Sequence, residues 1–188
     1  MKTEIKIIKI LIENKELTIR EISKKISSDY KITYTAVQNL IKKDIISIKT
    51  IGKSSLCSLN KVFSYEIYKA EDERKQELLK NKNLNQLYKE ILKIKTSFFI
   101  FLIFGSYAKN RQSKTSDIDL MFISNEKDFE KTINNVLSLL PLKTHLLVFT
   151  EEEFIRMKDS KENSVVREII EKNIILYGIE NYYKLKNA

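Results

Sequence analysis

The sequence predicts an α+β protein with a helical N-terminal segment that ends in a β-hairpin, a helical connector, and a small mixed sheet flanked by helices. Three observations predict this class. Residues 1–61 have helical apolar spacing that gives way to two short β-like runs, residues 62–95 contain no glycine or proline, and residues 96–188 alternate apolar runs with amphipathic helical segments. We expect these three ranges to be the domains.

The first two helices are predicted from apolar spacing and capping. Ile5 and Ile8 belong to a series of apolar residues at helical spacing within residues 3–13. Thr18 then precedes a second apolar-periodic run, and Glu21 follows three residues later. A threonine and a glutamate at this spacing form a capping box, so we expect a second helix to begin at Thr18.

A third helix and a hairpin complete the N-terminal segment. We expect the helix to run from Thr33 to about Lys43, after a polar connector. Short β-like runs at residues 45–50 and 56–59 are joined across Gly52 and predict a hairpin. This order of three helices and a hairpin resembles a winged helix-turn-helix domain.

The charge of this segment predicts an anionic partner. The chain has a net charge of +9; residues 1–61 contain 13 basic and 6 acidic side chains, whereas the remaining 127 residues contain 21 and 19. The winged-helix resemblance implies DNA, with the third helix in the major groove and the hairpin against the backbone. The residues expected to contact DNA are Thr33, Thr35, Gln38, Asn39, Lys42, Lys49 and Lys53.

Other readings of the segment stay open. Domains that resemble a winged helix also bind RNA or proteins, or only dimerise, and a run of lysines is often an ordinary solvated face. The third helix has no arginine, the residue that most often reads guanine. Base recognition would therefore rest on Gln38 and Asn39, which suit adenine, or on DNA shape.

The connector, residues 62–95, is predicted to be one long helix or two consecutive ones. Asn81 and Asn83 mark the expected break, because asparagine favours caps and turns. The first part is expected to join the domains or to form the arm of a homodimer. The second part, residues 84–95, is expected to pack on the sheet.

Two predicted strands in the C-terminal segment carry the candidate functional residues. An apolar strand is predicted at residues 97–104 and stops at Gly105, and a second strand at residues 117–123 begins with two aspartates. Side chains alternate along a strand, so Asp117 and Asp119 are expected on one face, about 6.6 Å apart along the chain. Two such carboxylates suit Mg²⁺, which completes its coordination with substrate phosphates. Glycine and serine opening a short helix offer backbone N–H groups to those phosphates.

The remaining elements alternate between helix and strand. Apolar periodicity predicts these elements, with Pro141 ending the first helix and Gly178 ending the last strand. They are a helix at 129–140, a strand at 143–149, helices at 151–158 and 163–172, a strand at 174–177, and a terminal helix or tail at 179–188.

Gly105-Ser106, ten intervening residues, and Asp117-Ile118-Asp119 together resemble the signature of the polymerase-β-like nucleotidyltransferase superfamily. The chain is most similar to the small archaeal and bacterial minimal nucleotidyltransferases. The resemblance implies that Gly105 and Ser106 hold a nucleoside triphosphate such as ATP, and that Asp117 and Asp119 are catalytic residues that bind Mg²⁺. It also implies charge neutralisation of the phosphates by Lys109 or Arg111.

Two departures from the family pattern bear on catalysis. Family members usually carry a third carboxylate on a later strand, whereas the candidate strand at 143–149 has none and contains His145, the only histidine. Histidine titrates near neutral pH, so His145 is either the general base or a structural residue. Glu151 to Glu153 fit better as the first turn of a helix capped by Thr150. The other departure is Asn110, where the family often has glycine; asparagine tolerates the left-handed conformation that such a turn needs.

Composition excludes several classes of protein. A single cysteine, Cys57, excludes an internal disulfide and fits a reducing, cytoplasmic location. One cysteine and one histidine also make a zinc site implausible. The longest strongly apolar run, residues 98–104, is far short of the roughly 20 residues of a membrane helix.

Two functions follow. In the first, the protein is a Mg²⁺-dependent nucleotidyltransferase that modifies a protein or nucleic-acid acceptor and also binds DNA. In the alternative, it is a DNA-binding transcriptional regulator or antitoxin whose nucleotidyltransferase module senses nucleotide or is inactive. The family resemblance implies a small helical partner of the HEPN type for the antitoxin version.

Overall fold

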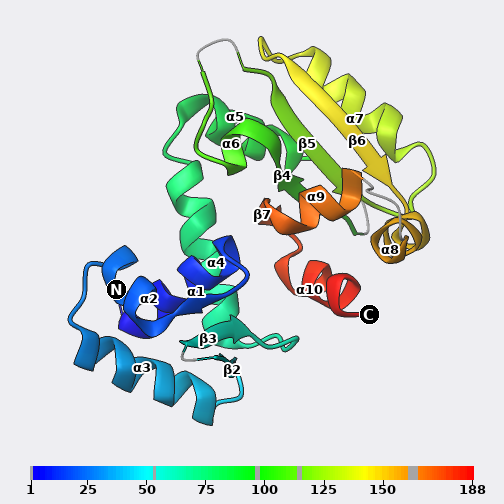
Figure 1. The fold of residues 1–188 in the computed structure, drawn as a ribbon. Coiled ribbons are helices and arrows are strands. Elements are labelled where there is room, and N and C mark those ends of the chain that lie inside the picture. Colours follow the sequence, from blue (N-terminus) through cyan, green and yellow to red (C-terminus); the bar gives the residue numbers. More distant parts are fainter. Residues whose placement is uncertain (1, 53, 96–97, 114–115, 161–164) are drawn as a thin grey trace. The chain divides into compact units, whose positions relative to one another are not determined.

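The computed structural model describes residues 2–52, 54–95, 98–113, 116–160 and 165–188 (Figure 1). The chain divides into two compact units. The first comprises residues 1–71 together with Asn187, and the second comprises residues 72–186 together with Ala188.

The first unit combines three helices with a small antiparallel sheet. Its strands have the order β1-β3-β2, and both pairs are antiparallel. Apolar residues from all three helices, among them Ile8, Ile22 and Leu40, are fully buried in its core. Its elements are α1 (Thr3–Glu13), β1 (Leu17–Thr18), α2 (Ile19–Lys25), α3 (Tyr30–Lys42), β2 (Ile46–Ile51) and β3 (Ser54–Leu59).

The capping box predicted at Thr18 is confirmed. The Glu21 backbone N–H donates to Thr18 Oγ1 at 3.2 Å, and the Thr18 N–H donates to Glu21 Oε2 at 2.8 Å. The bond from the Thr18 backbone lowers the pKa of the Glu21 carboxyl. The two-residue strand β1, which ends at the capping residue Thr18 itself, was not expected; Leu17 of β1 pairs with Cys57 of β3.

The predicted start of the third helix is wrong. Helix α3 begins at Tyr30, and Asp29 caps it by accepting a bond of 2.7 Å from the Lys31 N–H. Thr33 is therefore inside the first turn and fully buried, and its hydroxyl donates to the Asp29 carbonyl at 2.9 Å. A buried side chain bonded to its own helix cannot contact DNA, so Thr33 is removed from the candidate interface.

The connector consists of two helices, α4 (Tyr65–Leu78) and α5 (Lys82–Ile91). The break occurs where asparagine predicted it, because Asn81 caps α5 by accepting bonds from the Asn83 and Leu84 N–H groups.

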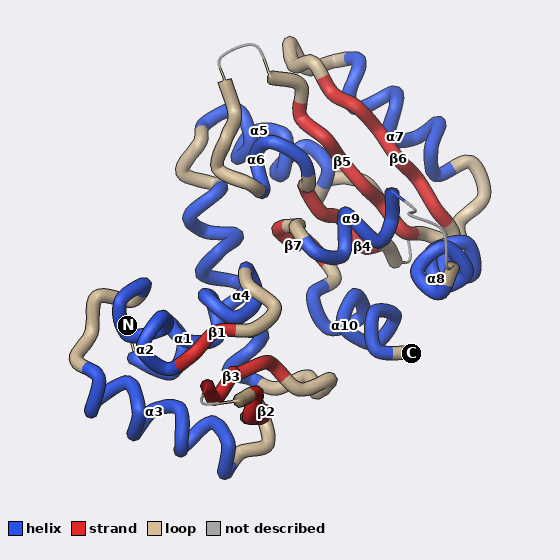
Figure 2. The backbone as a smooth tube through the Cα atoms, viewed as in Figure 1, coloured by secondary structure: helices blue, strands red, loops and turns tan. Residues whose placement is uncertain are grey.

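The second unit is built on a four-stranded mixed sheet with the order β6-β5-β4-β7. Strands β5 and β6 are parallel, and the other two pairs are antiparallel. The strands lie side by side in Figure 2. The elements that follow α5 are β4 (Ile100–Ile103), α6 (Gly105–Ala108), β5 (Ile118–Ile123), α7 (Phe129–Ser138), β6 (Thr144–Phe149), α8 (Glu151–Asp159), α9 (Val165–Glu171), β7 (Ile174–Tyr177) and α10 (Ile179–Asn187).

Both faces of the central strands are buried. Every residue of β4 is fully buried, and all of β5 except Asp119 is buried. Alternate strand residues such as Leu120 and Phe122 share a core cluster with Leu87 of α5 and Ile133 of α7. Asp119 is thus the one polar position in an otherwise apolar strand, and its exposure requires a functional or structural reason.

None of the helices within the described ranges is both long enough and apolar enough to cross a membrane.

Candidate functional site

The site is organised by the junction between β4 and α6. Strand β4 ends at Ile103, and α6 begins two residues later at Gly105, which has a left-handed φ of 65°. The Phe104 N–H donates to the Asp119 carbonyl at 3.1 Å. This bond continues the pairing of β4 with β5 and brings the start of α6 beside Asp119.

Glycine is required at position 105 for two reasons. A β-carbon there would collide with the carboxylate of Asp119, the nearest atom being Oδ2. The left-handed backbone would in addition strain any residue with a side chain. The Asp119 carboxylate therefore reaches the first residue of α6 only because that residue is glycine.

Asp119 also contacts the only histidine of the chain. Asp119 and His145 are paired in register on the parallel strands β5 and β6. His145 Nδ1 lies 3.3 Å from Asp119 Oδ1, and the two side chains are 59% and 25% exposed. The edge of the His145 ring also meets Phe104, with ring centroids 6.4 Å apart. One carboxylate oxygen thus faces the imidazole while the other faces Gly105.

The first aspartate of the pair lies outside the strand. Strand β5 begins at Ile118, so Asp117, which was expected within it, directly precedes it and is exposed. In the described part of the chain, no three histidine, cysteine, aspartate or glutamate side chains come together as a metal-binding group. Asp119 and His145 are brought together, whereas Asp117 does not join them in such a group.

The predicted phosphate-binding residues lie in α6 and in the turn that follows it. The Arg111 N–H donates to the Ser106 carbonyl at 2.9 Å, and Asn110 takes the left-handed conformation with φ 52°, as the sequence predicts. Lys109 Nζ forms an ion pair of 2.7 Å with Glu168 Oε1 of α9. Arg111 is exposed and Ser106 is partly buried.

Glu168 and Phe104 are the neighbours that sequence reasoning missed. Glu168 is 59 residues from Lys109 in the sequence. No local motif marks such a pair, so only the folded chain reveals it.

Strand β6 carries no carboxylate, and the nearby glutamates have another role. Thr150 caps α8, and Glu153 closes a capping box through a bond of 2.8 Å from the Thr150 N–H. This bond lowers the pKa of the Glu153 carboxyl. The cap follows the last residue of β6, whereas His145 is the second residue of that strand, so Glu153 lies at the other end of β6 from Asp119.

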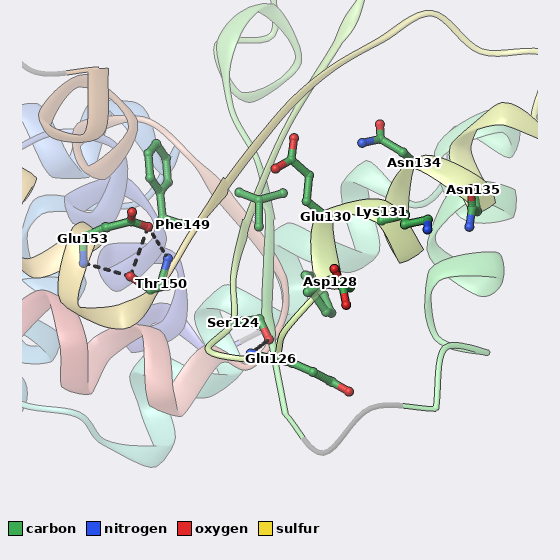
Figure 3. A pocket seen from close by; sticks show the side chains of 12 residues that line it. Ser124, Glu126, Asp128, Glu130, Lys131, Asn134, Asn135, Phe149, Thr150 and Glu153 are labelled. Carbon is green, nitrogen blue, oxygen red and sulfur yellow. Dashed lines mark hydrogen bonds between the residues drawn. The ribbon is translucent and has the colours of Figure 1, made fainter.

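A pocket of about 650 Å³ opens at that other end of β5 and β6. Figure 3 shows Asp128 and Glu130 at the start of α7, and Thr150 and Glu153 at the start of α8, among its lining residues. None of the residues proposed for nucleotide or metal binding lines it.

The candidate DNA-contacting residues lie on the first unit. Thr35, Asn39 and Lys42 of α3 are exposed, Gln38 is partly buried, and Lys49 of β2 is exposed. Lys53 lies outside the described residues. The outer surface of α3 also carries Tyr30 and Tyr34, whose rings stack at 6.3 Å and which are about half exposed.

Comparison with known proteins identifies the second unit. Residues 86–182, just over half of the chain, match the family described as Polymerase beta, Nucleotidyltransferase. Two proteins of Methanocaldococcus jannaschii, both with the provisional name protein adenylyltransferase, are similar to the chain. They are 34% identical over 95 and 96 residues, which cover 50% of this chain and 91% of each relative. No solved structure matches the chain significantly. The matched range includes Gly105, Asp119 and His145, and the chain belongs to the polymerase β-type nucleotidyltransferase family.

Proposed function

We propose that the second unit transfers a nucleotidyl group from a nucleoside triphosphate, ATP in the first instance, to a hydroxyl group of a macromolecule. The contact between Gly105 and the Asp119 carboxylate carries this proposal. It supports a site where a carboxylate meets the backbone at the start of α6, which suits a triphosphate bound together with a cation.

A divalent cation fits the donor set. Asp119 and Asp117 are the candidate ligands, with phosphate oxygens completing the coordination; two carboxylates predict Mg²⁺. The 25% exposure of Asp119 leaves its carboxylate accessible to a substrate. When bound, the cation would neutralise the triphosphate and orient the α-phosphorus for in-line attack.

The chemical step exchanges one bond to the α-phosphorus for another. The acceptor hydroxyl oxygen bonds to the α-phosphorus, and the bond from that phosphorus to the oxygen bridging to the β-phosphorus breaks, releasing pyrophosphate. The hydroxyl proton passes either to His145 or to a phosphate oxygen of the nucleoside triphosphate. Gly105 and Ser106 would bind the distal phosphates, and Lys109 or Arg111 would offset their charge. Lys109 must first leave Glu168, its partner at 2.7 Å.

The provisional names of the two relatives favour a protein acceptor. We propose that AMP is transferred from ATP to a serine, threonine or tyrosine hydroxyl. A nucleic-acid hydroxyl is the competing acceptor.

Label transfer tests this function. ATP labelled at the α-phosphate should label acceptors in a cell extract, whereas ATP labelled at the γ-phosphate should not, because the γ-phosphate leaves with pyrophosphate. Protease sensitivity of the label would identify a protein acceptor, and nuclease sensitivity a nucleic acid. An Asp117→Asn/Asp119→Asn variant is the control, and full labelling by that variant would overturn the proposal.

A second function is favoured by the first unit. We propose that it is a winged helix-turn-helix domain that binds DNA. Three helices followed by an antiparallel hairpin support this, as does the excess of 13 basic over 6 acidic residues in residues 1–61. A regulator or antitoxin whose second unit only senses nucleotide would bind ATP and DNA without transferring label.

A further inference from the structure

His145 and Asp119 present a nitrogen and an oxygen to the same space. They are neighbours in register on parallel strands, and their side chains approach on one side of the sheet. Nδ1 and Oδ1 are 3.3 Å apart, and both side chains are open to solvent. The contact is therefore accessible to a ligand.

This separation matches a shared metal ion as well as a hydrogen bond. Two ligand atoms at adjacent corners of an octahedron, with bonds of about 2.1 Å, lie about 3.0 Å apart. The observed distance of 3.3 Å is close to that value. The two donors need only a small side-chain adjustment to bind one cation.

The nitrogen changes which cation binds best. Mg²⁺ binds oxygen ligands and rarely takes imidazole. Imidazole nitrogen favours first-row transition ions, whose affinity for mixed nitrogen and oxygen sites rises from Mn²⁺ onward. A carboxylate at position 145 would give an all-oxygen site instead.

We infer that His145 is a metal ligand through Nδ1, together with Asp119, and that it shifts the preference of the nucleotide site from Mg²⁺ towards first-row transition ions, for which Mn²⁺ serves as the probe. The inference rests on the proposed nucleotide site. It also selects between the two proton acceptors, because a histidine that binds the ion through Nδ1 carries its proton on Nε2 and is not the base. The hydroxyl proton then passes to a phosphate oxygen of the nucleoside triphosphate.

The chain permits an unambiguous test, because it contains one histidine. Untagged protein labelled with ¹⁵N-histidine is mixed with Mn²⁺ and a non-hydrolysable ATP analogue and examined by pulsed electron paramagnetic resonance. Coupling of ¹⁵N to Mn²⁺ is expected, and it cannot arise from the adenine nitrogens because these are unlabelled. Absence of coupling while Mn²⁺ and nucleotide remain bound would overturn the inference and leave the proposed function intact.

A second measurement covers metal preference. Calorimetry measures the affinity for the same nucleotide analogue in the presence of Mn²⁺ and in the presence of Mg²⁺. The quantity compared between the wild type and His145→Asp is the affinity with Mn²⁺ divided by the affinity with Mg²⁺. We expect the ratio to fall by roughly tenfold or more in the variant, since altering even a residue behind a metal ligand costs about 10–100-fold in affinity. Thermal unfolding of His145→Asp and His145→Gln checks that both are folded. An unchanged ratio contradicts the inference, and no binding with either ion overturns it together with the proposed nucleotide site.

Discussion

The side chain of Asp119 occupies the space that a side chain at Gly105 would need. The two residues meet because β4 and β5 are adjacent, with the Phe104 N–H bonded to the Asp119 carbonyl at 3.1 Å. The glycine therefore lets a carboxylate approach the first backbone amides of α6. This proximity is the basis of the proposed triphosphate site.

Replacing Gly105 by alanine should abolish nucleotide binding. Its β-carbon would displace the Asp119 carboxylate, and the φ of 65° would add about 1–2 kcal/mol of backbone strain. Gly52→Ala is a matched control, because Gly52 has φ 59° but, among the described residues beyond its chain neighbours, none has an atom within 4 Å of an added β-carbon. Both variants should unfold at a lower temperature, and only Gly105→Ala should lose binding of an ATP analogue in calorimetry. Wild-type affinity in Gly105→Ala would refute the proposed role of this contact.

Removing the charge of Glu168 should strengthen nucleotide binding. Lys109 is held by Glu168 at 2.7 Å and must leave it to reach a phosphate. Ion pairs as exposed as this one contribute about 1 kcal/mol or less, so Glu168→Gln should raise the affinity by up to roughly fivefold. Lys109→Ala should lower it.

The control for this pair is Glu180→Gln, which breaks another surface ion pair, that of 2.9 Å between Glu180 and Lys184 on α10. We expect no change in affinity for that variant. Weaker binding by Glu168→Gln would show that the glutamate supports the site rather than competing for Lys109.

The stability of the first unit should depend on pH through Lys43. Its Nζ lies 3.1 Å from Glu4 Oε2 and 2.9 Å from Glu66 Oε1. The bond from Lys43 lowers the pKa of Glu66 from its ordinary 4.5, so this contribution is present above that pH and is lost as the pH falls through the lower, folded pKa. The bond to Glu66, and to a smaller extent the bond to Glu4, raises the pKa of Lys43 from its ordinary 10.5. The contribution of the charged lysine to stability is therefore present below 10.5 and is lost only as the pH rises through the higher, folded pKa.

Urea unfolding at a series of pH values checks this expectation. Glu66→Gln should be less stable than the wild type at neutral pH, and the difference should shrink in acid. Glu16→Gln, an exposed residue of the same unit, should follow the wild type throughout. A Glu66→Gln difference that stayed constant down to the lowest pH would exclude the pair as its cause.

DNA binding by the first unit should weaken to the same extent for different DNA sequences when exposed lysines are removed. Lys42→Ala and Lys49→Ala should each reduce the slope of log affinity against log salt by about 0.9 if each contacts one phosphate. Lys80→Ala changes an exposed lysine of the other unit and should leave the slope unchanged. Fluorescence anisotropy with duplex DNA measures all three. A salt slope unaffected by either first-unit variant would argue against DNA contact at these positions.

Several local features of the fold could be predicted from short-range sequence signals. Thr18 and Thr150 mark helix starts through capping boxes, which involve only residues three apart, and both are confirmed. Asn110 was expected in a left-handed turn because its side chain tolerates that conformation, and it has φ 52°.

The predicted start of the third helix was wrong because an aspartate earlier in the sequence caps the helix. Helix α3 begins at Tyr30, three residues before the predicted start at Thr33, because Asp29 caps it. The Asp29 carboxylate accepts a bond from the Lys31 N–H, and the Asp29 carbonyl accepts one from the Thr33 hydroxyl. The Lys109–Glu168 pair depends on how α9 lies near α6 within the second unit, which no local pattern encodes.

Calorimetric titration with a non-hydrolysable ATP analogue tests the central claim most directly. It compares the wild type with Asp117→Asn/Asp119→Asn, with and without a divalent cation. The proposed function predicts cation-dependent binding to the wild type that is lost in the double variant. Binding that is equal in both proteins, or absent from the wild type with Mg²⁺ and with Mn²⁺, would contradict a metal–nucleotide site at Asp119.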